Sequence, residues 1–256
     1  MNRNRLQSYM ELQSSIESNE YLTTTQAMIQ GIEHIIQKWD TVYTDTLLIQ
    51  SGNGIFLNAI LRFIPHVCII EPSAETFIEL QRQYLHLSLF GNSLYYINAD
   101  AKSFDYTIIV YPALYLSKND VQEVLREAIR VTTRSILLLF FNIYSLEYYL
   151  HTLYNRKEYN RYIWYTPFQL RSLVSSIQNN ISISFSSVGL FPLGHTIRTR
   201  QRYRIFPYPI GTIGLMSLHI PQSKVMTPIL NPLRTQSKGQ LHWGGANRSR
   251  CKSSHK

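Results

Sequence analysis

The chain has 256 residues, 45% of them hydrophobic, which is enough for one domain with additions or for two small domains. No apolar run reaches the roughly 18 residues of a membrane-spanning helix, and no apolar segment follows the first arginines, so we expect neither a membrane span nor a secretory signal. The two cysteines, Cys68 and Cys251, lie far apart, which argues against a disulfide framework and favours the reducing cytoplasm.

The formal net charge of +9 is distributed unevenly along the chain. All 16 acidic residues lie between Glu11 and Glu158, whereas the stretch from Tyr159 to Lys256 has none and holds 13 of the 25 Lys and Arg residues. This asymmetry predicts an anionic partner for the carboxyl-terminal part. A solvated basic surface with a solubilising tail is the alternative interpretation.

The first motif follows a helical amino-terminal segment. Apolar residues at helical spacing predict one or two helices over residues 6–39. A short apolar run, Thr46 to Ile49, then leads into Gly52-Asn53-Gly54 and a further helical pattern. A strand, a tight glycine turn and a helix are typical of a loop that cradles a nucleotide-like ligand. Because Phe56 stands where a third glycine is expected, a plain turn between strand and helix is the alternative.

Beyond this motif, strands and helices alternate along the chain. Two helix starts carry capping signals: Ser117 precedes Asp120 by three residues, and Thr166, Pro167 and Gln169 suit the N-cap, N1 and N3 positions. The alternation predicts a three-layer α/β domain with a mainly parallel sheet. In chain order we predict a strand at 46–50, a helix at 55–64, a strand at 66–73, a helix at 74–90, strands at 94–100 and 105–111, a helix after Ser117, a strand at 135–141, a helix at 166–177, and strands at 181–190 and 211–220.

Acidic residues follow two of the predicted strands. Ligands of such sheets bind beyond the carboxyl ends of the strands, where Glu71 and Asp100 would lie beside the glycine turn. A carboxylate at Glu71 can accept hydrogen bonds from a ribose diol, and Asp100 could accept one from the amino group of an adenine. Taken singly, each is more often an ordinary polar loop residue. Their order at successive strand ends is what suggests a nucleoside site.

At this point the sequence resembles a known family. The segments TLLIQSGNG, CIIEPS and above all FDYTIIVYPALYLSKNDVQEVLREAIRV are similar to the type 11 group of class I S-adenosylmethionine-dependent methyltransferases. More narrowly, LLLFFNIYSL and MTPILNPLRTQSK resemble an uncharacterised proteobacterial branch of that group whose first motif is degraded. The resemblance implies a Rossmann-like class I methyltransferase fold, with a seven-stranded, mainly parallel sheet and an antiparallel last strand. It also implies S-adenosylmethionine as cofactor.

The same resemblance assigns the cofactor contacts, with two departures. Gln50 stands where the group has an acid, so its amide can hydrogen-bond but cannot form an ion pair with the ammonium of the cofactor, and Phe56 replaces the third glycine. The implied cofactor-binding residues are Gln50, Gly52 and Gly54 at the methionine part, Glu71 at the ribose, Asp100 and Ala101 at the adenine, and Tyr111 near the sulfonium.

The acceptor side has several candidates and no identified catalytic base. Asn142 falls in the stretch that resembles the branch after its fifth strand, and His195 is either a base or an ordinary loop histidine. Alternating arginines would project from one face of an extended segment, where they could bind a phosphate, a carboxylate or RNA, or only protect a sheet edge. These arginines are Arg198, Arg200, Arg202 and Arg204.

The sequence therefore predicts a cytoplasmic S-adenosylmethionine-dependent methyltransferase with an unidentified acceptor, for which an anion is one candidate. The alternative is a catalytically inactive protein of the same fold that binds RNA or another anionic partner. The eight histidines show no metal-ligand spacing with the cysteines, so we expect no metal. We expect a helical segment at 1–40, the methyltransferase domain at 41–221 and a disordered basic tail at 222–256.

Overall fold

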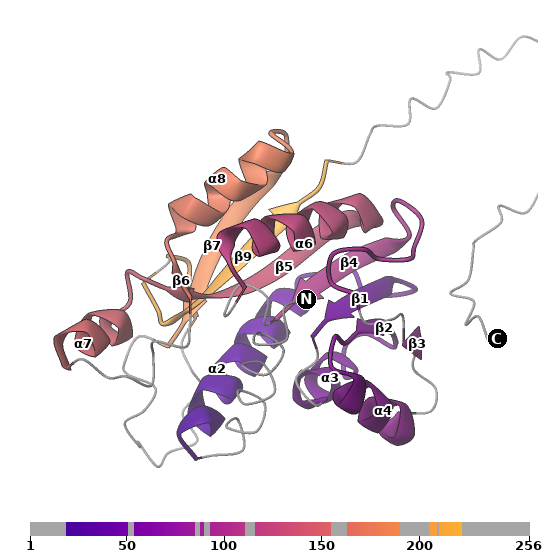
Figure 1. The fold of residues 1–256 in the computed structure, drawn as a ribbon, viewed down its shortest axis with the longest axis horizontal. Helices are drawn as coiled ribbons and strands as arrows, with labels where there is room; N and C mark the ends of the chain where they lie inside the picture. The colour runs from indigo at the N-terminus through magenta and orange to yellow at the C-terminus, as the bar shows by residue number, and fades with distance from the viewer. Residues whose placement is uncertain are drawn as a thin grey trace, which may run out of the picture.

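A computed structural model describes residues 19–50, 54–84, 88–89, 93–110, 116–154, 163–189, 205–208 and 210–221 (Figure 1). The strands are β1 (Asp45–Ile49), β2 (His66–Ile70), β3 (Ser88–Leu89), β4 (Phe104–Ile109), β5 (Thr132–Asn142), β6 (Trp164–Tyr165), β7 (Ser182–Val188), β8 (Ile205–Phe206) and β9 (Ile213–His219). The helices are α2 (Asn19–Ile36), α3 (Ile55–Ile60), α4 (Ala74–Gln83), α6 (Lys118–Val131), α7 (Leu146–Tyr154) and α8 (Pro167–Ile177).

The described strands form one mixed sheet. Its nine strands run in the order β3-β2-β1-β4-β5-β9-β7-β8, and β6 pairs with β5 outside this path. Strands β1 to β5 pair in parallel, whereas β9 lies antiparallel to both β5 and β7. The predicted parallel sheet with an antiparallel last strand is therefore confirmed. The count exceeds the predicted seven because β6 and β8, of two residues each, join the sheet.

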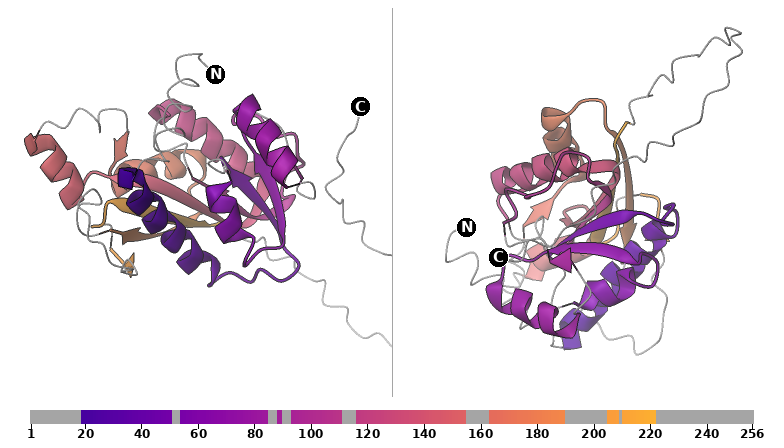
Figure 2. Two further views of the ribbon diagram at one scale, coloured as in Figure 1. Left: turned by 90° about the horizontal axis from the view of Figure 1, so that it is seen from below. Right: turned by 90° about the vertical axis from the view of Figure 1, so that its right-hand side faces the viewer.

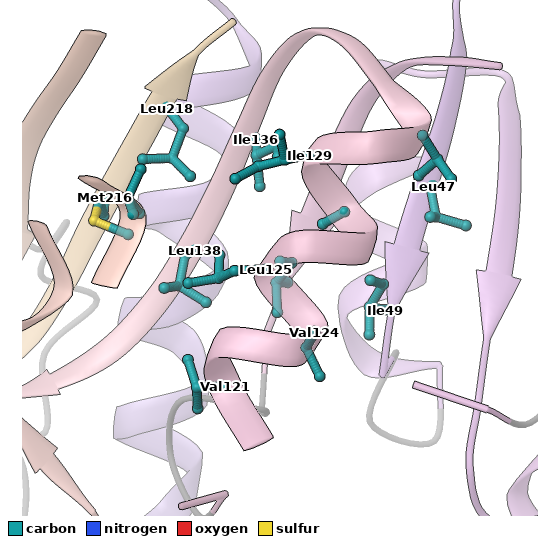
Figure 3. Close-up of a cluster of buried hydrophobic side chains, with 14 of the residues drawn as sticks. Leu47, Ile49, Val121, Val124, Leu125, Ile129, Ile136, Leu138, Met216 and Leu218 are labelled. Atoms are coloured by element: carbon teal, nitrogen blue, oxygen red, sulfur yellow. The ribbon is translucent and has the colours of Figure 1, made fainter. Parts of the chain in front are cut away.

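Helices cover both faces of the sheet, which makes three layers (Figure 2). Helices α2, α3 and α4 share a buried cluster with one face, and α6 and α8 share another with the opposite face. The apolar residues whose spacing predicted α6 form a buried stripe along the helix, and each of them is at most 5% exposed. The stripe consists of Val121, Val124, Leu125, Ala128 and Ile129 and packs over Leu47, Ile49, Ile136 and Leu138 (Figure 3).

The predicted helix starts are confirmed by their hydrogen bonds. The Asp120 backbone N–H donates to Ser117 Oγ at 3.4 Å, so Ser117 caps α6. At α8, the Gln169 N–H donates to Thr166 Oγ1 at 3.0 Å while the Thr166 N–H donates to Gln169 Oε1 at 2.8 Å. This reciprocal pair is a capping box that satisfies two donors otherwise left unpaired at a helix start.

The third strand is not where the sequence placed it. Residues 94–100 form no strand, and β3 lies earlier, at Ser88–Leu89, beyond the end of α4 at Gln83. The reason is that the backbone of 94–100 finds its partners on a helix. The Ile97 N–H donates to Glu127 Oε2 at 3.2 Å, and the Ile97 and Ala99 carbonyls accept from Arg130 at 2.7 and 2.8 Å.

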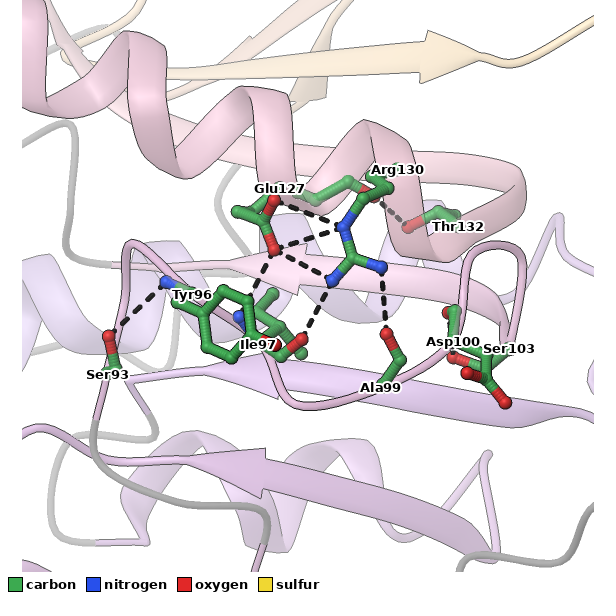
Figure 4. A network of polar contacts seen from close by, with 10 residues as sticks. Ser93, Tyr96, Ile97, Ala99, Asp100, Ser103, Glu127, Arg130 and Thr132 are labelled. Carbon is green, nitrogen blue, oxygen red and sulfur yellow. Dashed lines mark hydrogen bonds and ion pairs between the residues drawn. The ribbon is translucent and has the colours of Figure 1, made fainter.

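Glu127 and Arg130 thus hold this crossover segment against α6 (Figure 4). The two side chains also pair with each other, Arg130 Nη2 lying 2.8 Å from Glu127 Oε2. The hydrogen bond from Arg130 lowers the pKa of Glu127, so the carboxylate stays charged. The segment therefore descends from the end of β3 to the start of β4 without a helix of its own.

Helix α7 was not predicted. The strand β5 ends at Asn142, one residue beyond its predicted end, and the chain then turns into α7 after Ser145. Tyr148 of α7 packs on Trp164 of β6, with ring centroids 5.2 Å apart. Among the helices of the described residues, none combines the length and the apolar character needed to cross a bilayer.

We expect Arg130→Met to lower the free energy of unfolding by about 2 kcal/mol, because it leaves two backbone carbonyls and a carboxylate without their charged donor. Arg126 offers a matched control, since it pairs with Glu123 at the same spacing on the exposed side of α6. Arg126→Met should leave the free energy of unfolding nearly unchanged, because an exposed ion pair contributes little. Chemical denaturation measures both, and hydrogen exchange should speed up at residues 93–100 only in Arg130→Met. Equal losses in the two variants would contradict this role for Arg130.

Candidate functional site

The carboxyl ends of β1, β2 and β4 bring three of the predicted residues to one edge of the sheet. Ile49 pairs with Ile70 on one side and with Ile109 on the other. The Gln50 N–H donates to the Ile70 carbonyl at 2.9 Å, which continues the ladder by one residue. Gln50 therefore sits directly beside Glu71, and Gly54 begins α3 a few residues on.

Gln50 has the most unusual environment of these three residues. Its side chain is fully buried, and neither Nε2 nor Oε1 has a hydrogen-bond partner among the residues that the structure describes. Its backbone is also left-handed, with φ of 61°. A left-handed residue other than glycine costs about 1 kcal/mol, and an unsatisfied buried amide costs about 1–3 kcal/mol. Such costs, concentrated at one residue, are typical of ligand sites.

Glu71 is a buried carboxylate held at the adjacent strand end. The side chain has no exposed surface, and its Oε1 accepts a hydrogen bond of 3.4 Å from the Ser73 N–H. Ser73 in turn caps α4 by accepting from the Thr76 N–H at 3.3 Å. The start of α4 thus fixes the carboxylate beside Gln50, where a diol could donate to it.

Gly54 is required by its backbone conformation. Its φ of 82° lies in the left-handed region that favours glycine. A Cβ atom there would also lie 3.2 Å from Leu80 Cδ2 and 3.3 Å from Tyr84 Cε2. The first helix turn therefore packs closely under α4, and the backbone of the turn stays near the strand ends.

Asn142 is the last residue of β5, in the part of that strand that extends past the end of β4 and forms a wall beside the site. Because Ile109 pairs with Leu138, β5 continues four residues beyond the end of β4 and pairs there with β6 and β9. Asn142 is fully buried, donates from Nδ2 to the Gly211 carbonyl at 3.0 Å and accepts at Oδ1 from the Tyr144 N–H at 3.1 Å. Its amide therefore links the residues before β9 to those before α7.

Asp100 and Ala101 are not brought to this edge. They lie in the turn that enters β4, where Ser103 Oγ donates to the Asp100 carbonyl at 2.9 Å and the Lys102 N–H donates to the Arg130 carbonyl. That turn is at the amino ends of β4 and β5, and Asp100 is exposed there. The prediction that Asp100 follows the third strand is wrong, because the crossover descends past the sheet before this residue.

The remaining predicted site residues lie outside the described residues. They are Gly52, Tyr111, His195, Arg198, Arg200, Arg202 and Arg204, and their predicted roles are unchanged. Within the described residues, no group of three or more His, Cys, Asp or Glu side chains could hold a metal ion.

Tyr165 is a site-forming residue that sequence analysis missed. It belongs to β6, is 4% exposed, and its hydroxyl donates to the Leu116 carbonyl at 3.2 Å. Burial raises the pKa of its phenol to about 12. The bond links the wall at β5 and β6 to the residues that follow β4. The only signal in the sequence was an aromatic pair directly before the Thr-Pro start of α8.

No protein-family model and no curated protein sequence matches the chain. Several solved structures of similar fold are S-adenosylmethionine-dependent methyltransferases. One from Thermotoga maritima, described as a possible histamine N-methyltransferase, has a TM-score of 0.62 at 13% identity and covers 82% of this chain and 98% of its own. Magnesium protoporphyrin IX methyltransferase from Synechocystis, solved with bound S-adenosylhomocysteine, has a TM-score of 0.60 at 11% identity and covers 86% and 96%.

The small RNA methyltransferase HEN1 is also similar in fold, with a TM-score of 0.53 at 13% identity, covering 77% of this chain and 25% of that one. At these identities the likeness concerns the fold alone. The chain therefore has the Rossmann-like fold of class I methyltransferases, as predicted.

We expect Gln50→Met to raise the free energy of unfolding of the ligand-free protein by about 1 kcal/mol, because the near-isosteric side chain removes an unsatisfied buried amide. Asn142→Leu is the contrasting change, since that buried amide has partners on both sides. It should lower the free energy of unfolding by about 2 kcal/mol. Urea denaturation measures both, and a clear destabilisation by Gln50→Met would show that its amide has partners.

A further prediction concerns Tyr165 and pH. Its pKa is higher in the folded chain than the ordinary 10, so the stability it contributes is complete below pH 10 and is lost as the pH rises towards about 12. The loss amounts to roughly 3 kcal/mol over the full range. Tyr165→Phe should remove this pH dependence, measured as the difference in unfolding free energy between about pH 9 and about pH 11. Tyr208→Phe, at an exposed tyrosine, should leave it unchanged.

Proposed function

We propose that the protein is an S-adenosylmethionine-dependent methyltransferase. The observation that carries this proposal is the buried amide of Gln50, which has no partner among the described residues, beside the buried Glu71 carboxylate at the strand edge of a methyltransferase fold. Both groups stand where the resemblance assigns cofactor contacts. A plain turn between strand and helix would not require a left-handed residue with an unsatisfied amide.

The two side chains suit different parts of the cofactor. The Glu71 carboxylate would accept hydrogen bonds from the ribose diol. The Gln50 amide would donate to the carboxylate of the methionine part or accept from its ammonium, without an ion pair. The adenine would lack the acidic partner expected at Asp100, since that residue lies at the opposite edge. When bound, the cofactor supplies a sulfonium methyl group, and the protein has to bind it and orient the acceptor in line.

The transfer itself makes modest demands on this chain. The acceptor atom forms a bond to the methyl carbon as the carbon–sulfur bond breaks, and the electron pair stays on sulfur as a neutral thioether. A base is needed only where the acceptor carries a proton that must leave. No described residue at the edge is assigned that role. The similar structures are named for different acceptors, so the fold does not choose among them, and we retain an anionic acceptor on the arginines at 198–204 as the finer proposal.

Calorimetric titration with S-adenosylmethionine and S-adenosylhomocysteine tests the proposal. Glu71→Ala should weaken binding at least tenfold, because it removes charge-assisted hydrogen bonds that contribute about 1.5–3 kcal/mol. Gln50→Glu should strengthen binding of the ammonium-bearing cofactor. Glu75 is an exposed acid in the first turn of α4, so Glu75→Ala is the matched control and should bind normally.

Absence of binding at millimolar cofactor in both the wild type and Gln50→Glu would overturn the proposal. Binding without methyl transfer to any acceptor, even in the presence of cell extract as acceptor source, would favour the inactive binding protein instead.

A further inference from the structure

Four apolar side chains are exposed around the carboxyl end of β5, and we call them the rim. Tyr144, Phe168 and Tyr208 are 54, 71 and 67% exposed, and Ile210 is 42% exposed. Tyr144 follows β5, Phe168 lies in the first turn of α8 directly after β6, and Tyr208 and Ile210 precede β9. Exposed apolar side chains that gather in one place mark a binding surface.

Hydrogen bonds bring the three segments of the rim together. The Asn142 amide accepts from the Tyr144 N–H at 3.1 Å and donates to the Gly211 carbonyl at 3.0 Å, so it joins the segment after β5 to the segment before β9. The Ile143 N–H donates to the Tyr165 carbonyl at 3.1 Å, which joins the segment after β5 to the one that leads into α8. The three segments therefore meet at the carboxyl end of β5, and helix α7 projects from the same end of the molecule (Figure 1).

The segment before β9 is held firmly although its apolar side chains are exposed. Ser187 Oγ accepts from the Gly211 and Ile210 N–H groups at 2.9 and 3.3 Å and donates to the Tyr208 carbonyl. Gly211 lies so close to β7 that a Cβ atom would be 2.6 Å from the Val188 carbonyl oxygen. A surface that is fixed in this way loses little conformational freedom when a ligand binds, which favours binding.

The rim lies on the same edge of the sheet as the candidate site. Ile109 of β4 pairs with Ile49 of β1 on one side and with Leu138 of β5 on the other, so only β4 separates β1 from β5. Gln50 and Glu71 follow β1 and β2 at this edge, and the rim surrounds the end of β5. A methyl acceptor has to lie next to the methyl donor, so the rim is in place to hold one.

The side chains of the rim indicate which chemistry it would recognise. Three of the four are aromatic rings, and such rings stack on other flat rings. Within the described parts of the chain, residues 143–146, 163–170, 205–208 and 210–212 include no charged side chain. A nucleic acid needs cations for its phosphates, and these segments offer none. The surface therefore suits a flat ring system without charge.

We propose that the rim binds the methyl acceptor through an uncharged aromatic ring system. Tyr144, Phe168 and Tyr208 would supply ring contacts, and Ile210 would supply an aliphatic one. The anionic group proposed above would be a separate part of the same acceptor. That the bound molecule receives a methyl group rests on the proposed function, whereas the binding of an aromatic ring system to the rim does not.

Equilibrium dialysis of the full chain without cofactor tests this proposal with 2-naphthol and with decahydro-2-naphthol, which has the same carbon skeleton but is not flat. 2-Naphthol should bind about fivefold more tightly, because only the flat ring system can stack. The combined variant Tyr144→Ser, Phe168→Ser, Tyr208→Ser should bind 2-naphthol about tenfold more weakly. Tyr144→Phe combined with Tyr208→Phe should bind like the wild type, because the rings are kept.

The matched control is Tyr43→Ser, Ile78→Ser, Tyr96→Ser, which removes three exposed apolar side chains elsewhere and should bind 2-naphthol like the wild type. Equal binding by the two triple serine variants, equal binding of the two probes, or no binding of millimolar 2-naphthol by the wild type would overturn the proposal. Self-association of the wild type that disappears in the rim variant would also overturn it, because a second copy would then cover the rim.

Single-stranded oligouridylate is the probe for the competing class of ligand. If it binds the wild type, displaces 2-naphthol and is lost from the rim variant, the rim is a nucleic-acid surface and the proposal fails. Calorimetry with S-adenosylhomocysteine keeps this test separate from that of the proposed function, because the rim variant should bind this nucleoside like the wild type. A chain that binds 2-naphthol at the rim but no S-adenosylhomocysteine would contradict only the methyltransferase proposal.

Discussion

The length of β5 is the constraint on which the rest of the architecture depends. Its eleven residues pair with β4 on one side and with β9 on the other, and the last two also pair with β6. Where β4 stops, β5 continues, and the continuation forms the wall that carries Asn142. If β5 ended where β4 ends, β6 would lose the strand with which it pairs. Trp164 of β6 would then no longer be held where Tyr148 of α7 packs on it. The wall that carries Asn142 and the projecting helix α7 are thus both consequences of one long strand.

At the carboxyl ends of β1 and β2, the chain keeps a buried polar side chain at a cost in stability. Gln50 combines a left-handed backbone with a buried amide that has no partner among the described residues. Glu71 next to it is a buried carboxylate positioned by the capped start of α4. Natural sequences rarely bury an amide and a carboxylate side by side for structural reasons alone. At the amino-terminal edge, by contrast, Arg134 pairs with Asp105 and Lys102 donates to the Thr132 carbonyl.

Sequence patterns correctly predicted those elements that depend on interactions between residues close together in the chain. The stripe that forms α6 and the two capped helix starts appeared as expected, because helical spacing and capping act within a few residues. The segment 94–100 was mistaken for a strand because its partners are Glu127 and Arg130, some thirty residues away. Because of that error, Asp100 was assigned to the site, although it lies at the opposite edge of the sheet. Helix α7 was missed because its exposed leucines and buried acid invert the pattern on which such predictions rely.

The position of β9 has a consequence for how the chain is made. The last of the described strands, β9, lies between β5 and β7, so among these strands β7 and β8 join the rest of the sheet through β9. During synthesis the amino-terminal strands can associate early, but the edge of β5 stays open until residues 213–219 have been added. An open, apolar edge strand is a template for pairing with other chains. A nascent chain of this protein therefore carries its greatest risk of aggregation late, when most of its sheet is already built.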